Sequence, residues 1–289
     1  MKYSNKILTL LLAFVLVATS CEDNFLDVNK DPNNPSDATV KLVLPAGQMS
    51  AAFALGGQGQ ILGSLWAQHW TQSTGASQYA TIDDYNLTDA FFNTQYIELY
   101  AGALNDLNFV SKKASETQSW NYFLIAESMK AYVFQVLVDL YDKVPYNQAL
   151  QGTIYPTPAF DNGDAIYTDL IAKIDAALAK DRSLSPEPAD DDLVFQGDMD
   201  NWVRFANTLK LKILMRQSEA RPSVAQQGIQ ALFASGAEFL DTDAEVASYI
   251  DVENFRNPFF AVQVSTAGNG RGYVDIAASS TLLGYLQNN

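Results

Sequence analysis

The side chains that could perform chemistry are unevenly represented in this 289-residue chain. There is one cysteine, Cys21, one histidine, His69, and 33 aspartates and glutamates. A single histidine excludes a metal site built from several histidines and disfavours a Ser-His-Asp triad. The sequence contains no GxSxG, HExxH, P-loop or dinucleotide-binding motif. Glycoside hydrolysis needs only a pair of carboxylates, so it stays open as an alternative without a motif to support it.

Metal and cofactor chemistry find little support in the remaining polar residues. The run Asp190-Asp191-Asp192 lies in an acidic connector over residues 181–200. Three neighbouring carboxylates can bind calcium, but most such runs are solvated loops, and a solvated loop is the interpretation we favour. His69 lies between two tryptophans, and we expect it to pack within a helix. The sequence therefore predicts no cofactor and no metal.

Aromatic side chains are better candidates for binding a ligand. Tyr79, Tyr85 and Tyr155 lie in expected loops, where a helical core cannot easily bury them. Trp66 and Trp70 are four residues apart, which places them on one face of an expected helix. Core packing is favoured for Trp66, whereas Trp70 fits a core position and a stacking platform equally well. The predicted ligand site contains Trp70, Tyr79, Tyr85 and Tyr155, beside polar side chains that could donate and accept hydrogen bonds.

Helices must position these residues, because helical periodicity dominates the sequence. Apolar residues recur every three or four positions in successive segments, and strand patterns are few. This pattern predicts an all-α dominated fold, an α-solenoid of tetratricopeptide-like helix pairs with irregular loops and few strands. Gly56–Gly59 is expected to break the first helix, and Asp200 to cap a later one. The expected helices cover residues 40–55, 60–72, 92–110, 120–141, 166–178, 202–216 and 224–233.

The N-terminal residues have the pattern of a secretory signal peptide that ends at the cysteine. Two lysines precede the apolar run Ile7–Ala18, which is shorter than the roughly 20 residues that span a bilayer. The junction Val17-Ala18-Thr19-Ser20-Cys21 is similar to a lipobox, in which the cysteine thiol receives a lipid. The predicted parts are a signal peptide, a lipidated tether and a single helical domain, over residues 1–20, 21–39 and 40–289.

The charge of the chain limits its partners. Removal of residues 1–20 takes away two of the 18 basic residues and no acidic residue. The remaining chain has 16 basic and 33 acidic residues, which gives a net charge of −17. Such a charge repels nucleic acid and anionic lipid. We therefore predict no nucleic-acid partner, and membrane contact through the lipid anchor only.

Seven stretches with recognisable patterns follow one another along nearly the whole chain. The clearest is AESMKAYVFQVLVDLYDKVPYNQAL, an expected helix that ends in the turn Asp139–Tyr146. The others are SCEDNFLDVNKDPNNP, LPAGQMSAAF, WAQHWTQSTG, IYTDLIAKIDAAL, NWVRFANTLKLKILMR and Asn257-Pro258-Phe259. In this order they make the chain resemble the SusD/RagB family of bacterial outer-membrane nutrient-binding lipoproteins.

The resemblance implies a fold, a function and partners. Members of the family bind glycans, peptides or other nutrients and form a lid on a SusC-like, TonB-dependent outer-membrane transporter. Their helical half contains four tetratricopeptide-like helix pairs. The family has no catalytic residues, so the resemblance implies a protein that is not an enzyme. The aromatic residues that bind ligands vary between members of the family, so the resemblance assigns no ligand-binding residue in this chain. Because members are usually longer, this chain resembles an N-terminal portion that is truncated at its C-terminus.

The predicted function is capture of an oligosaccharide or peptide and its delivery to the transporter. The resemblance implies a protein held in the outer membrane by lipid on Cys21. Glu22-Asp23 resembles the acidic export signal of surface lipoproteins, which would place the body on the cell exterior. Two alternatives stay open: a surface glycoside hydrolase, and a structural subunit of the transporter complex that binds no ligand.

Overall fold

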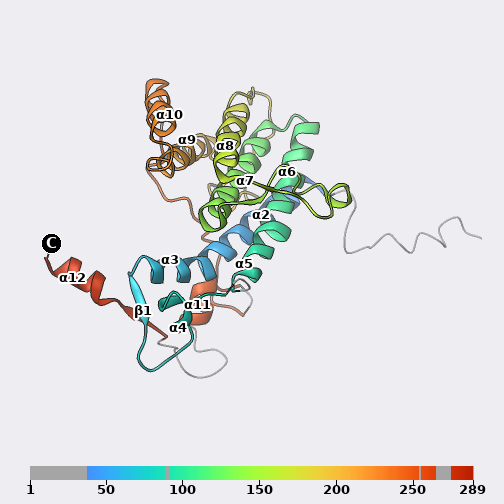
Figure 1. The fold of residues 1–289 in the computed structure, drawn as a ribbon. Coiled ribbons are helices and arrows are strands. Elements are labelled where there is room, and N and C mark those ends of the chain that lie inside the picture. The colour runs from blue at the N-terminus through green and yellow to red at the C-terminus, as the bar shows by residue number, and fades with distance from the viewer. Residues whose placement is uncertain (1–37, 89–90, 254, 265–274, 289) are drawn as a thin grey trace, which may run out of the picture. The chain divides into compact units, whose positions relative to one another are not determined.

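The computed structural model describes residues 38–88, 91–253, 255–264 and 275–288, and helices dominate these ranges (Figure 1). From Thr39 onward the chain forms one compact unit. The predicted signal peptide, the lipidated Cys21 and nearly all of the tether lie outside the described residues. Within the described ranges, no helix is long and apolar enough to cross a membrane.

The first two long helical stretches each contain a π-helical segment. One runs through α2 (Val40–Ala54), the π segment η2 (Leu55–Gly59) and α3 (Gln60–Trp66). The other runs through α5 (Asn93–Ile97), the π segment η3 (Glu98–Leu104) and α6 (Asn105–Glu116). A π segment adds a residue to a helical turn and often marks a functional site.

The expected helix break at Gly56–Gly59 is wrong. Gly59 keeps ordinary helical torsion angles, with φ of −62° and ψ of −40°, so the helix continues through the glycines. Their missing side chains instead admit neighbours from other helices. A Cβ on Gly59 would lie 2.8 Å from Nε2 of Gln95, and one on Gly57 would lie 3.3 Å from Cβ of Pro258.

The later helices follow the predicted periodicity closely. They are α7 (Trp120–Tyr141), α8 (Gly163–Leu178), α9 (Met199–Met215) and α10 (Pro222–Ala234). The N-cap of α9 is Asp198, not Asp200 as expected: an Asp198 carboxylate oxygen accepts a hydrogen bond from the Asn201 amide at 3.0 Å. Asp200 lies in the first turn of α9, where its negative charge interacts favourably with the positive end of the helix dipole.

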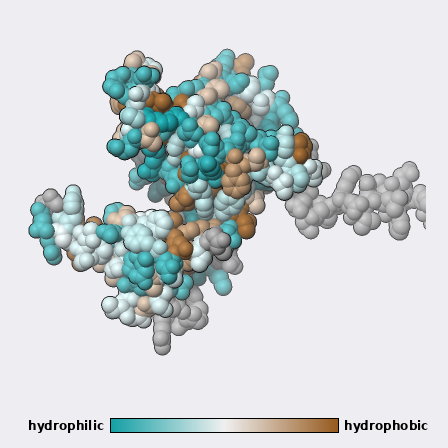
Figure 2. Space-filling view, viewed as in Figure 1, coloured by the Kyte–Doolittle hydropathy of each residue, from teal (hydrophilic) through white to brown (hydrophobic). Residues whose placement is uncertain are grey.

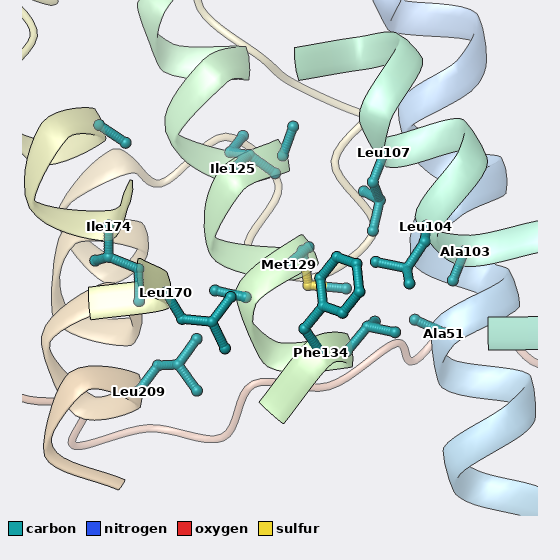
Figure 3. Packing of buried hydrophobic residues seen from close by; sticks show 14 of the residues in the cluster. Ala51, Ala103, Leu104, Leu107, Ile125, Met129, Phe134, Leu170, Ile174 and Leu209 are labelled. Carbon is teal, nitrogen blue, oxygen red and sulfur yellow. The ribbon is translucent and has the colours of Figure 1, made fainter. Parts of the chain in front are cut away.

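The main core is formed by apolar side chains of α2, η3 and α6–α9. Helix α7 contributes most, because it packs against α6, α8 and α9. Figure 3 shows side chains from neighbouring helices meeting in this interior, among them Leu107, Phe134, Leu170 and Leu209. Figure 2 shows mainly hydrophilic residues on the visible face around α8 and α10.

Short strands and helices connect and flank these elements. The connecting helices are α4 (Ala80–Asp83), the 3₁₀ turn η4 (Gly152–Ile154), α11 (Pro258–Gln263) and α12 (Ser280–Asn288). Two antiparallel pairs are β1 (Trp70–Gln72) with β4 (Ile276–Ala278), and β2 (Val144–Pro145) with β3 (Phe160–Asp161). The described residues contain no larger sheet, which agrees with the prediction of few strands.

The expected helix over 60–72 is wrong in its second half. Helix α3 ends at Trp66, and Gln68 adopts a positive φ of 56°, which directs the chain out of the helix. Trp70 then pairs with Ala278 in the β1–β4 ladder. Trp66 and Trp70 therefore do not share a helix face. His69, which we expected to pack within this helix, is exposed.

The acidic connector is largely exposed or half-buried, as expected of a solvated loop, but Asp192 departs from that expectation. Asp192 is fully buried, and its carboxylate accepts four hydrogen bonds. The donors are Nε2 of Gln48 (2.8 Å), the amides of Val194 (3.1 Å) and Gly197 (3.0 Å), and Nε1 of Trp202 (2.7 Å). These donors occupy both oxygens, so the carboxylate joins α2 to α9 and leaves no lone pair aimed at a cation.

Candidate ligand-binding site

An aromatic groove lies between the end of α3, the start of α5 and the end of α7. Its cavity has a volume of about 580 Å³, in the range of small-molecule sites. Five of its lining residues are aromatic, and only Lys143 is charged. The lining residues, called the aromatic groove below, are Leu62, Trp66, Leu87, Thr88, Phe92, Asn93, Tyr96, Leu140, Tyr141, Lys143 and Phe160.

Trp66 of the groove lining forms an exposed stacked pair with Tyr85, which lies outside the lining. Their ring centroids are 5.7 Å apart, with planes inclined by 29°. Trp66 is 43% exposed and Tyr85 is 56% exposed. Nε1 of Trp66 donates to the Ile82 carbonyl at 3.1 Å, which fixes the orientation of the indole. Exposed rings held in place in this way can stack against the apolar face of a sugar or a peptide side chain.

The turn after α4 puts Tyr85 in this position. Its backbone has a positive φ of 56°, an uncommon conformation for a residue other than glycine. The Tyr85 hydroxyl donates to the Trp66 carbonyl at 3.4 Å. Uncommon backbone angles cost free energy and gather at functional sites, so this turn supports a role in binding.

Packed tyrosines line the interior of the groove. Tyr96 contacts Tyr100 and Tyr141, with ring centroids 4.7 Å and 5.4 Å apart. Burial raises the pKa of Tyr96 and of Tyr141, so both phenols are neutral at physiological pH. The Tyr141 hydroxyl is buried without a hydrogen-bond partner in the structure. A polar ligand could satisfy this hydroxyl if it displaced the groove side chains slightly.

The structure separates the four predicted ligand residues. Tyr85 does not line the aromatic groove itself but stacks on Trp66, which does. Trp70 is partly buried and stacks on Phe259, with ring centroids 5.2 Å apart. Tyr155 is 40% exposed, after η4, and is not among the groove lining.

Tyr79 is only 8% exposed, so the expectation that a loop would leave it uncovered is wrong. Its hydroxyl accepts a hydrogen bond from Nε2 of Gln263 at 2.6 Å. Burial raises the pKa of Tyr79, and the nearby charge of Asp275 raises it further. Tyr79 packs in a small cluster with Ile61, Leu62, Leu65 and Ile82, but its hydrogen-bond partner Gln263 comes 184 residues later, so no local pattern could reveal that contact.

Sequence reasoning missed Trp66 and Phe160 as groove residues. Core packing was favoured for Trp66, whereas the side chain is 43% exposed. Phe160 is 66% exposed, beside the Pro-rich segment that precedes β3. A large apolar side chain shortly after the turn-forming residues Gly152, Pro156 and Pro158 is the sequence signal that could have identified it. Among the described residues, no group of three or more His, Cys, Asp or Glu side chains could hold a metal ion.

Comparisons with known proteins identify the fold. A family model described as SusD-like, "Starch-binding associating with outer membrane", matches residues 32–288. No curated protein matches the chain. A solved chitin-binding protein has a TM-score of 0.68 and 22% sequence identity, and the match covers 86% of this chain and 52% of that one.

Two solved SusD homologues show the same fold. One, from Bacteroides uniformis, has a TM-score of 0.65 and 20% identity over 84% of this chain and 51% of its own. The other, from Bacteroides ovatus, has a TM-score of 0.64 and 20% identity over 86% of this chain and 49% of its own. The chain thus spans about half the length of these proteins. The predicted fold class and the family resemblance are both confirmed.

Proposed function

Because the chain belongs to the SusD-like family of starch-binding proteins that associate with the outer membrane, we propose that it captures a nutrient glycan at the cell surface. The observation that supports this proposal most directly is the exposed Trp66–Tyr85 stack beside the aromatic groove. A solved chitin-binding protein of the same fold adds support for a glycan over a peptide.

The size of the groove and the net charge of the chain favour weak binding of a neutral oligosaccharide. Stacking contributes about 1 kcal/mol per ring, so two rings and a few hydrogen bonds give micromolar to millimolar affinity. The net charge of −17 after removal of residues 1–20 disfavours acidic glycans, since it repels anions. Weak, reversible capture suits a protein that must release its ligand to a transporter.

The proposal includes an anchor and a partner. Cys21 would receive lipid after cleavage of residues 1–20, and residues 21–39 would connect the lipid to the body. The SusC-like, TonB-dependent transporter is the proposed recipient of the ligand, on the strength of family membership. Replacement of Cys21 by Ser should release the protein from outer membranes. A variant that stays membrane-bound would show that the transporter, not the lipid, retains it.

Binding can be tested with soluble oligosaccharides of starch and chitin and with a neutral peptide, by isothermal titration calorimetry. Trp66→Ala and Tyr85→Ala should each weaken oligosaccharide binding about fivefold to tenfold, because each removes one stacking ring. Tyr155→Ala is the matched control, since this tyrosine is also exposed but, unlike Tyr85, does not stack on a residue of the groove lining. If only Tyr155→Ala weakened binding, the site would lie around Tyr155 and our choice of groove would be wrong.

A further inference from the structure

A second cavity lies where the two π segments meet α4 and α11. Its volume is about 630 Å³, and Gly57 and Gln58 of η2 and Glu98 of η3 contribute to its wall. Figure 1 shows α3, α4 and α11 close together in space, although α11 is far from the other two in the sequence. Contacts of α4 with α3 and of α11 with η2 agree with this arrangement. Two π segments at one cavity are notable, because π segments are found preferentially at functional sites.

The wall of this cavity contains a buried amide without a partner. Gln95 is 2% exposed, and neither its Nε2 nor its Oε1 has a hydrogen-bond partner in the structure. A buried amide that makes no hydrogen bond costs free energy, and natural proteins rarely leave one without a reason. The missing side chain of Gly59 provides the space that Nε2 of Gln95 occupies. The glycine at position 59 therefore leaves room for the Gln95 amide.

The rest of the lining indicates the chemistry of an occupant. Apolar surfaces come from Phe53, Ile61, Ile82, Phe91 and Pro258, and further amides come from Gln58 and Gln78. The one basic lining residue in the described part of the wall, Arg256, already donates to Asp251 at 2.6 Å. Glu98 and Glu253 are also part of the wall, and their negative charges repel anions. These features suit a neutral ligand with apolar faces and many hydroxyl groups.

We propose that this cavity binds a single neutral sugar residue, with the Gln95 amide as its central hydrogen-bonding group. One amide presents a donor and an acceptor side by side, which matches two adjacent sugar hydroxyls. The terminal torsion of a glutamine side chain is broad, so a small rotation brings the amide to a ligand in the cavity. The proposal rests on the proposed function only for the class of ligand, and the cavity is lined by different residues from the aromatic groove.

The test is saturation-transfer NMR on the full chain with D-glucose, D-galactose and N-acetyl-D-glucosamine as separate probes. We expect at least one sugar to bind the unsubstituted protein. Gln95→Leu should weaken that binding about tenfold or more, since two hydrogen bonds are lost at similar side-chain volume. Gln60→Leu, at an exposed glutamine of α3, is the matched control and should bind normally.

Stability separates a ligand site from a structural role. Gln95→Leu should unfold at the same temperature as the unsubstituted protein or higher, because it removes a buried amide that had no partner. Lower stability with unchanged sugar binding would overturn the proposal, and so would the absence of binding by all three sugars.

Trp66→Ala distinguishes this cavity from the groove. It should weaken oligosaccharide binding and leave monosaccharide binding intact. Loss of monosaccharide binding in Trp66→Ala would place the sugar in the groove and overturn the inference. Failure of oligosaccharides to bind, with monosaccharide binding still dependent on Gln95, would instead count against the proposed groove.

Discussion

Replacement of Asp192 by Asn should destabilise the protein strongly without changing side-chain volume. In the structure each carboxylate oxygen accepts two hydrogen bonds, one oxygen from Gln48 and Val194 and the other from Gly197 and Trp202. An amide keeps only one oxygen, so its NH₂ group must face two of these donors. Each buried donor left unpaired costs about 1–3 kcal/mol. We therefore expect a loss of about 2–6 kcal/mol, and more for Asp192→Ala.

Thermal and urea unfolding monitored by circular dichroism would measure this loss. For a chain of this size, about 2–4 °C of melting temperature corresponds to 1 kcal/mol, so Asp192→Asn should melt about 4–24 °C lower. Asp190→Asn is the matched control: this exposed aspartate lies in the same acidic run and should change stability by less than about 0.5 kcal/mol. Equal melting temperatures for the two variants would refute the assignment of Asp192 as a buried structural carboxylate.

Other predictions concern the backbone, acid stability and a close helix contact. Gly197→Ala should lower stability by about 3 kcal/mol or more, measured by urea unfolding, because Gly197 has a φ of +86° and an added Cβ would lie 2.1 Å from the Pro188 carbonyl oxygen. An unchanged unfolding midpoint would contradict the turn geometry. Burial alone would raise the pKa of Asp169, but hydrogen bonds from Tyr146 and Lys173 hold this pKa below its usual value. A lowered pKa in the folded state adds stability above the unfolded pKa of about 3.9, and this stability is lost as the pH falls through the folded value. Tyr146→Phe should therefore flatten the loss of stability below about pH 4, and a carboxyl carbon NMR titration should show a higher pKa for Asp169; an unshifted titration would exclude this hydrogen bond as a cause. Gly163→Ala should cost about 1–3 kcal/mol, since the new Cβ would lie 2.7 Å from the Asp142 carbonyl oxygen and 2.8 Å from Cγ1 of Val138. A neutral result in differential scanning calorimetry would show that α8 can move away from α7.

Helical periodicity was sufficient to predict most of the fold. The helix over Trp120–Tyr141 was predicted with its observed bounds, because a long apolar pattern ends where the chain turns toward Pro145. Gly56–Gly59 was misinterpreted because a break and a close approach of two helices call for the same residue type. Only the positions of Gln95 and Pro258 in space distinguish the two.

The candidate site was less predictable, because distant segments decide which aromatics are covered. Tyr85 was correctly expected to be exposed, since its partners are local. Tyr79 depends on Gln263, and Trp70 depends on Phe259 and β4. Asp192 is a similar case: one of its four donors belongs to α2, 144 residues earlier. Polar residues in a turn-rich segment look solvated until their long-range partners are known.

The pairing of β1 with β4 has a consequence for the order of folding. Gln72 Nε2 donates to the Asp275 carbonyl across 203 residues of sequence. Closing a loop of that length costs about 3.5 kcal/mol more entropy than closing a four-residue hairpin. Only three residue pairs form this ladder, against the many local contacts that join α6 to α7. We expect the ladder to form last and to open first, so its amides should exchange with solvent hydrogen faster than those of α7.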